Sequence, residues 1–490
     1  MTLADLEPVI ERYHHLIGAN KFDEAIRLFI DRLHNPIYFQ LANYNLEIQL
    51  LRALFPEGED HPPRLQKEAE QAWTLNSLAN SYALSGQPEQ AVPLYLRMTS
   101  LYENEKNDVA LAIGLENVAQ TAQLPIGQLF ASAVHLRKSI ALCQQMKDEK
   151  WEAEGHRNLG IVLEYQGQWQ KENRVNPAMN GERETLKSEL VSAFELFEKH
   201  NIVKGLSLVS LHRALAFLLQ ARLSFFQLDA KENDVQFALQ ALQQAGEASA
   251  YEKKNAETVY PVSRDFVDAY WLVGEALLQC LAADASLHEQ KFEVHFYDEP
   301  FQQITESLRL QKDNALHVAE RCLSEALRRC RSVNMVDVEP NLLLAWARLE
   351  WRKSVERRAK KAEINLENIE EYLKEAREIA ERAGYRLALA DIHLFCAEVL
   401  LDLRKSVGAQ HAAPLHSLTI PEHLQKAKDY ALDISEFAHL YQSPDPHFYD
   451  GIPEAAMLKR GLTKQERIDN GYWVAYKIAE ALEKRYARLG

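Results

Sequence analysis

The stretch WTLNSLANSYALSGQPEQAVPLYLRMTSLY, residues Trp73–Tyr102, decides the fold that we expect. Apolar residues recur at helical spacing on both sides of Gly86, which predicts two amphipathic helices. The small side chains of Ala79 and Ala91 allow these helices to approach closely, and Gly86 supplies the tight turn between them. The stretch is therefore expected to fold as an antiparallel pair of helices.

Two further stretches have the same layout. NKFDEAIRLF (Asn20–Phe29) has Asn20 where the first stretch has glycine, and asparagine is the next residue of choice for a left-handed turn. NLGIVLEYQGQW (Asn158–Trp169) has Gly167 at the turn. Glu172 stands where alanine is expected, which predicts that the following helix packs differently or is displaced. Three copies in register indicate an array of helix pairs.

This order of large, small and aromatic residues, with a Gly-x-x-x-x-Ala turn, resembles the tetratricopeptide repeat. The resemblance implies an all-α fold, a right-handed solenoid of tetratricopeptide-like antiparallel helix pairs. A solenoid exposes the apolar face of its last pair unless a further element covers it. We expect the amphipathic run from about Lys464 to Leu489 to be a C-terminal capping helix.

The chain divides into three segments. We expect regular tetratricopeptide-like repeats over residues 1–172, longer and less regular helix pairs over 173–443, and a terminal loop with the capping helix over 444–490. Insertions at 283–311 and 406–420 interrupt the middle segment. Its helix pairs are expected at 205–227 with 231–249, 262–282 with 312–332, 337–353 with 366–383, and 385–404 with 421–441.

Composition excludes several classes of protein. The net charge of −15 argues against general binding to phosphate backbones, so we expect no nucleic-acid partner. The five cysteines are scattered and form no CxxC pair, which is typical of reduced thiols. We find no signal peptide and no apolar stretch of about 18 residues. A cytoplasmic protein without a membrane partner is expected.

Motifs for catalysis are absent from the sequence. The chain has no GxxxxGK[ST] phosphate loop, no GxGxxG after a strand and no GxSxG elbow. The stretch LHEQKFEVH (Leu287–His295) holds its histidines too far apart to share a helix face as zinc ligands do. We therefore expect no enzyme activity, and no catalytic, cofactor-binding or metal-binding residues.

One cluster of cations contrasts with the acidic remainder of the chain. Its members are Arg348, Arg352, Lys353, Arg357, Arg358, Lys360 and Lys361. The dipole of a helix favours cations at its C-terminus, so solvation of a helix end explains the cluster. The alternative is a docking patch for an acidic partner, a phosphate or nucleic acid. On that view Arg352, Arg357 and Arg358 are candidate partner-binding residues.

The first helix of a tetratricopeptide pair lines the concave face of the solenoid. Counting back from the turn glycines places five candidate partner-binding residues there: Trp73, Asn76, Asn80, Arg157 and Glu164. Asn76 and Asn80 lie one helical turn apart and offer paired donors and acceptors, which suits the backbone of an extended peptide. Solvation of an exposed helix is the alternative explanation for these asparagines.

Stretches along nearly the whole chain resemble the C-terminal helical half of bacterial STAND-type signalling ATPases, of the NACHT or NB-ARC-like kind. They are Leu51–Tyr95, Asn117–Cys143, Tyr260–Leu278, Ala383–Leu403 and Gly471–Leu482, and their order matches that half. The resemblance implies recognition of a trigger, relief of autoinhibition and assembly of a signalling complex, often in antiviral defence. The NTPase and effector segments of the family are missing here, so no catalytic residue carries over. We expect either the sensor part of a longer polypeptide or a gene product that supplies the sensor on its own.

Three hypotheses follow. The first is a non-catalytic recognition solenoid, the sensor part of a STAND-like system, which binds a trigger protein or an NTPase or effector subunit and oligomerises through a partner module. The second is a constitutive tetratricopeptide scaffold or adaptor that assembles a partner enzyme complex. The third is an enzyme with an active site in the insertion at 283–311. A neighbouring ATPase gene would favour the first hypothesis, and turnover of a substrate would favour the third.

Overall fold

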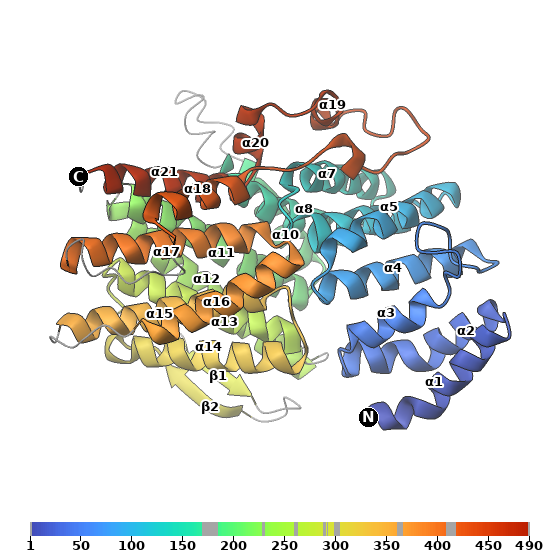
Figure 1. The fold of residues 1–490 in the computed structure, drawn as a ribbon, viewed down its shortest axis with the longest axis horizontal. Helices are drawn as coiled ribbons and strands as arrows, with labels where there is room; N and C mark the ends of the chain where they lie inside the picture. Colours follow the sequence, from blue (N-terminus) through green and yellow to red (C-terminus); the bar gives the residue numbers. More distant parts are fainter. Residues whose placement is uncertain are drawn as a thin grey trace.

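The computed structural model describes residues 2–168, 185–227, 231–258, 263–287, 291, 293–297, 304–359, 366–407 and 418–488. These residues are mostly helical (Figure 1), which confirms the expected all-α class in its coarse form. A two-stranded antiparallel sheet is the exception among them.

The N-terminal helices are α1 (Leu3–Gly18), α2 (Phe22–Phe29), the π-helical η1 (Ile30–Gln40), α3 (Tyr44–Arg52), α4 (Glu68–Leu84), α5 (Pro88–Asn104), α6 (Asp108–Asn117), the π-helical η2 (Val118–Gln123), α7 (Leu129–Met146) and α8 (Glu149–Tyr165). The middle of the chain contains α10 (Thr185–Lys199), α11 (Val203–Phe226), α12 (Lys231–Thr258), α13 (Ser263–Ala282), β1 (Glu293–Tyr297), β2 (Ile304–Arg309), the short 3₁₀ helix η3 (Lys312–Asn314) and α14 (Ala315–Ser332). The remaining helices are α15 (Glu339–Ala359), α16 (Glu367–Ala383), α17 (Arg386–Val407), α18 (Ile420–Ala431), the 3₁₀ helix η4 (Phe437–His439), α19 (Pro453–Arg460), α20 (Lys464–Asn470) and α21 (Trp473–Ala487).

Consecutive helices pack against each other, as α4 and α5 do on either side of Gly86. Several turns between them contain a residue with positive φ, a conformation that costs little only for glycine and, to a lesser degree, asparagine. In the N-terminal part these residues include Asn20, Gly86, Lys106, Gly127, Lys147 and Gly167. The predicted turn positions at Asn20, Gly86 and Gly167 are thus confirmed. From Gly86 onward the turns recur at nearly equal intervals, so this part of the chain repeats a helix of similar length.

Three of the turn glycines touch the C-terminal half of the chain. We call the following contacts the seam: Gly86 with Val336, Gly127 with Arg386, and Gly167 with Trp473. A Cβ added to Gly86 would lie 2.8 Å from Cγ1 of Val336, and one added to Gly167 would lie 2.2 Å from the ring of Trp473. Real Cβ atoms do not approach a neighbour so closely. Glycine is therefore needed at positions 86 and 167 for space as well as for backbone conformation, whereas at Gly127 the nearest atom is 3.1 Å away, on the flexible side chain of Arg386.

The segment after α18 lies across the N-terminus of α7 (Figure 1). Asp433 accepts a hydrogen bond from the backbone N–H of Phe130 at 2.8 Å, and the hydroxyl of Ser435 accepts one from that of Ala131 at 3.0 Å. Gln128, the residue before α7, provides no side-chain cap of its own. Burial raises the pKa of Asp433 to about 6, while hydrogen bonds from the backbone N–H groups of Phe130 and Ser435 favour its carboxylate. A distant segment thus caps α7.

Several expected helix boundaries are wrong. The helix expected at 231–249 continues to Thr258, and the one expected at 337–353 continues to Ala359. The helix expected at 421–441 ends at Ala431, because Leu432 and the residues after it leave the helix to reach α7. The capping helix expected from Lys464 is broken into α20 and α21 at Gly471, where a Cβ would lie 2.3 Å from the carbonyl oxygen of Ala431. Since α21 packs against α11, α17 and α18, it covers more than the last helix pair.

The insertion expected at 283–311 contains the hairpin of β1 and β2. Its inner strand is attached to the helices beneath it, because the hydroxyl of Tyr270 donates to the carbonyl of His295 at 2.7 Å and Arg329 donates to the carbonyl of Tyr297 at 2.6 Å. The insertion expected at 406–420 lies largely outside the described residues, as do Trp169 and Glu172.

Helix α11 corrects the expectation that no apolar stretch is long enough to cross a membrane. By length and composition Val203–Phe226 passes that test, and it is the one helix in the described ranges that does so. Most of its apolar window, 61%, is buried inside the fold. A core helix passes the same test, so the finding is weak support for a membrane span. All five cysteines belong to the described residues; they are buried, and none of them forms a disulfide.

We predict that Gly167→Ala lowers the stability of the folded protein more than Gly451→Ala. Both glycines have positive φ, at 63° and 84°, so both substitutions strain the backbone by about 1 kcal/mol. Space around Gly451 is open, whereas the new methyl at Gly167 would overlap Trp473 and add about 1–3 kcal/mol. Unfolding midpoints in urea measure the difference. Equal midpoints for the two variants would show that the seam adapts freely at this point.

Candidate functional site

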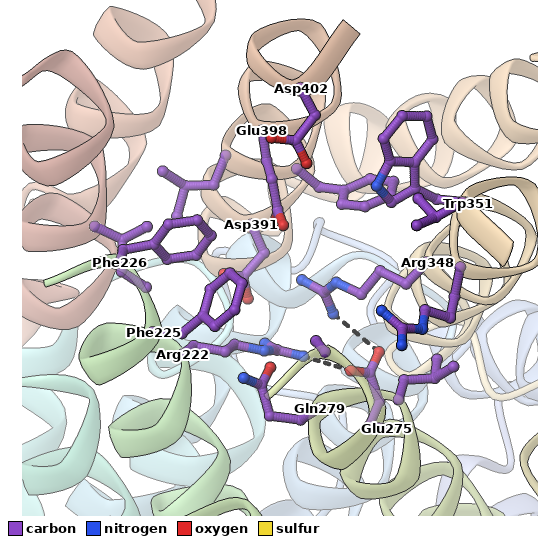
Figure 2. A pocket seen from close by; sticks show the side chains of 17 residues that line it. Arg222, Phe225, Phe226, Glu275, Gln279, Arg348, Trp351, Asp391, Glu398 and Asp402 are labelled. Carbon is purple, nitrogen blue, oxygen red and sulfur yellow. Dashed lines mark hydrogen bonds and ion pairs between the residues drawn. The ribbon is translucent and has the colours of Figure 1, made fainter. Parts of the chain in front are cut away.

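A network of buried charges connects α11, α13 and α15 (Figure 2). Glu275 of α13 accepts hydrogen bonds from Arg222 of α11 and from Arg348 of α15, the latter at 2.9 Å. The side chain of Glu275 is only 3% exposed. Burial opposes ionisation of this carboxyl, but Arg348 and Arg222 hold its pKa below the usual value. A buried charge is tolerated when it is compensated in this way.

Asp391 of α17 adds a second carboxylate to the network. The hydroxyl of Tyr472 lies 3.2 Å from both carboxylate oxygens and donates to them. Burial raises the pKa of Asp391, and the nearby Arg222 and Arg348 oppose that rise. Tyr472 also packs edge-on against Tyr165 of α8, with ring centroids 4.9 Å apart. The network therefore connects helices from both halves of the chain.

A cavity of about 180 Å³ opens beside the network, and we call it the central cavity. It is lined from α11, α13, α15, α17 and α21. Aromatic rings form much of its wall: Phe225, Phe226, Trp351 and Phe395. In Figure 2, Phe225 and Phe226 lie on one side and Trp351 lies on the other, with the charged side chains between them. The cavity thus combines apolar walls with charged groups.

Glu398 of α17 lines the central cavity close to Asp402 (Figure 2). Within the described part of the chain no hydrogen bond reaches its carboxyl group. Burial, reinforced by the charge of Asp402, raises the pKa of Glu398 to about 7, against the attraction of Arg348 and other arginines. This carboxyl is therefore partly protonated at neutral pH.

A larger space of about 570 Å³ lies between the N-terminal helices and the C-terminal half, and we call it the junction groove. One side includes Phe39, Asn80 and Gln120, and the other includes Asn341 and Tyr385. The ring of Phe39 is 68% exposed, which is rare for so large an apolar side chain. The charged residues of the described lining are two carboxylates, of Asp337 and Asp391.

The junction groove and the central cavity lie next to each other. Both are lined by Asp391. A small cavity of about 20 Å³ shares Tyr165 and Asn341 with the groove, and Arg222 and Arg348 with the central cavity. The charge network thus lies between a wider groove and a narrower cavity.

Asn80 is the one of the five predicted concave-face residues that lines the junction groove. Its Oδ1 accepts a hydrogen bond from the hydroxyl of Tyr95 at 2.5 Å. The amide N–H groups of Asn80 have no partner among the described residues, so they can donate into the groove.

Trp73 and Asn76 are half-buried. Trp73 packs edge-on against His34, with ring centroids 4.9 Å apart, and Asn76 accepts a hydrogen bond from Asn117 at 3.1 Å. Both side chains thus have partners within the N-terminal repeats.

Arg157 and Glu164 do not have the exposed position that was expected. Their exposures are 6% and 4%, because α11 packs against α8 where an open concave face would lie. Arg157 pairs with Glu154 at 2.8 Å, and Glu164 accepts a long hydrogen bond from Gln220 at 3.5 Å. A partner protein cannot reach either side chain in this conformation.

The cations of the basic cluster that was considered as a docking patch lie in different surroundings in the structure. Arg348 bonds to Glu275 in the charge network, and Lys353 bonds to Glu320 at 2.7 Å. Arg352 lines the central cavity, while Arg357 is exposed. The side chain of Arg358, with Lys360 and Lys361, lies outside the described residues. The structure therefore does not bring the described cations together as one patch.

The sequence did not lead us to expect Arg222, Glu275 or Asp391 as site residues. A signal existed, since Arg222, Glu275 and Asp391 are single charges within apolar helical runs (LLQARLSFF, LVGEALLQC and ALADIHLF). A lone charge on the apolar face of a helix indicates a buried partner of opposite sign.

No protein-family model matches the chain, and no curated protein is significantly similar to it. Among the described residues no group of three or more His, Cys, Asp or Glu side chains is arranged to hold a metal ion. The described residues form two spaces: a groove with amides and aromatic rings, and a cavity with charges and aromatic rings.

We predict that Glu275→Gln destabilises the fold by about 3 kcal/mol, because it leaves two buried guanidinium groups without their carboxylate. The matched control is Glu483→Gln, which removes the carboxylate of a more exposed pair with Lys428 and should cost no more than about 1 kcal/mol. Unfolding midpoints in urea at neutral pH test both values. A similar small loss for both variants would mean that the network does not hold the helices together.

We predict that the titration of Glu164 makes the folded protein less stable as the pH rises. Burial raises the pKa of this carboxyl from 4.5 to about 8, so the folded state binds its proton more tightly than the unfolded state does. Its contribution to stability is complete below the unfolded pKa and is lost as pH rises through the folded pKa. We expect Glu164→Gln to reduce the fall in melting temperature between about pH 5 and about pH 8.5. An identical pH profile for Glu164→Gln and wild type would contradict this, and Glu483→Gln serves as the exposed control.

Proposed function

We propose that this protein is a non-catalytic recognition protein that binds a segment of a partner polypeptide in the junction groove. The observation that carries the proposal is the groove itself, about 570 Å³ in volume, with Asn80 among its lining residues. Asn80 is the residue for which peptide contact was also expected from the sequence. A groove of this kind lies where two halves of a chain meet, as binding sites often do.

The lining supports an extended peptide as the occupant. Asn80, Gln120 and Asn341 each carry an amide that can both donate and accept, which matches the alternating groups of a peptide backbone. Aromatic rings beside these amides, including Phe39 and Tyr385, offer apolar area at a low cost in side-chain entropy. Since the charged lining residues are carboxylates, we expect a segment with neutral or basic side chains.

We further propose that the helices form a right-handed solenoid of tetratricopeptide-like pairs. The nearly equal spacing of turns from Gly86 to Gly167 supports a repeat architecture, as does the packing of consecutive helices. On this proposal the solenoid closes onto its own C-terminal half along the seam, instead of presenting an open concave face.

We also propose a biological role for the protein: it is a cytoplasmic sensor of a STAND-like signalling system and has no NTPase activity of its own. The resemblance of five stretches to the sensor half of those ATPases supports it. The partner would then be a trigger protein or an NTPase or effector subunit. A constitutive scaffold is the second candidate, and the same groove serves it equally. Affinity capture from challenged and unchallenged cells separates the two, because a sensor changes its partner on challenge and a scaffold does not.

We predict that Gln120→Trp blocks peptide binding. Gln120 is a half-buried residue of the groove lining, so the larger ring should occupy the groove at little cost to folding. Peptides are first selected from a displayed random library on the full wild-type chain, then measured individually by fluorescence anisotropy. Affinity for Gln120→Trp should be at least about tenfold lower.

Two further variants sharpen this test. Phe39→Ala removes an exposed groove ring and should also weaken binding, whereas Leu3→Ala removes an exposed apolar side chain from α1 and should not. Melting temperatures confirm that all three variants fold. Selected peptides that bind Gln120→Trp and Phe39→Ala as tightly as wild type would place recognition elsewhere on the protein.

A further inference from the structure

Two hydrogen-bond donors at the central cavity lack acceptors. Nε of Arg352 and Nε2 of Gln279 are buried, and neither has a hydrogen-bond partner in the described part of the chain. The nearest carboxylate oxygen to Arg352, from Glu356, is 3.9 Å away. A buried donor without an acceptor costs about 1–3 kcal/mol, so native proteins seldom leave two beside one cavity. These groups indicate a missing acceptor, for which a carboxylate is well suited.

The same cavity also contains a hydrogen-bond acceptor that lacks a donor among the described residues, the carboxyl group of Glu398. Glu398 has no hydrogen-bond donor within the described ranges, and Asp402 lies close to it. Asp402 disfavours the charge of Glu398. Arg348, Arg222 and Arg485 favour that charge without any hydrogen bond to it among the described residues. A bound ammonium group supplies a direct donor to this carboxyl. The cavity therefore offers one place for an anion and another for a cation.

The size and walls of the cavity restrict the ligand further. A volume of about 180 Å³ exceeds the roughly 150 Å³ of an engineered apolar cavity that takes up benzene, so there is room for one ring or a branched aliphatic group. Phe225, Phe226, Trp351 and Phe395 supply apolar contact for such a group. A folded domain or a long peptide does not fit.

We propose that the central cavity binds a small zwitterion, a free α-amino acid with an apolar or aromatic side chain. Its carboxylate accepts from Arg352 and Gln279, its ammonium group donates to Glu398, and its side chain lies among the aromatic rings. Arg222, Glu275 and Arg348 pair with one another, and together they form one border of the site. This ligand site is separate from the junction groove and does not depend on the proposed peptide binding.

The test uses the full chain and a panel of free L-amino acids, with melting temperature as the screen and calorimetric titration as the measurement. We expect at least one apolar or aromatic amino acid to bind saturably. Its amide, which keeps only the positive charge, and its N-acetyl derivative, which keeps only the negative charge, should each bind at least about tenfold more weakly. No saturable binding by any member of the panel would overturn the proposal. Equal binding of either singly charged analogue would overturn it too, in favour of a simple anion or cation site.

Variants locate the site. Glu398→Gln and Arg352→Gln should each weaken binding of the selected amino acid by at least about tenfold. The controls are Arg357→Gln, an exposed cation on the same helix as Arg352, and Glu378→Gln, an exposed carboxylate on the neighbouring helix α16 that does not line the cavity. Melting temperatures without ligand show whether each variant folds, and the analogue comparison on wild type stands without any variant. Equal affinity of both cavity variants and wild type would exclude the central cavity as the site.

Discussion

The close approach of three turn glycines to the C-terminal half is the constraint on which the rest of this fold depends. At Gly86 and Gly167 only a residue without Cβ leaves room for the side chain that lies on the turn, and at Gly127 the side chain of Arg386 lies nearly as close. The contacts follow the same order in both halves: Gly86 with Val336, Gly127 with Arg386, Gly167 with Trp473. Because the turns come at nearly equal intervals, successive helix pairs dock along one continuous line.

Closure of the chain on itself creates an interior that an open array of helix pairs would not have. That interior is only partly filled, since the junction groove and the central cavity remain in it. Between them, charges replace the apolar packing of a usual core, with Glu275 held between Arg222 and Arg348. Such a network fixes relative positions of helices, because each charge tolerates burial only in the presence of its partners. It also leaves polar groups beside both spaces, where a ligand can use them.

Local rules predicted the local features of this protein. The turns at Asn20, Gly86 and Gly167 could be predicted because a left-handed backbone conformation favours glycine or asparagine at the turn itself, and the sequence next to it shows where the helices end. Contacts between distant segments could not be predicted from the sequence. Helical periodicity shows that one face of a helix is apolar, but it does not show which other segment covers that face. Arg157 was expected to be exposed, and α11 covers it. The helix expected to reach residue 441 ends at Ala431, because Asp433 caps a helix more than half the chain away.

The beginning of α21 shows how the seam and the interior depend on each other. Tyr472 donates its hydroxyl hydrogen bond to Asp391 in the charge network, and the next residue, Trp473, lies on Gly167 in the seam. The position of one side chain therefore fixes that of the other. Asp391 in turn lines both the junction groove and the central cavity. A shift of α21 thus alters the contact between the two halves and the shape of both spaces at once, through two adjacent residues.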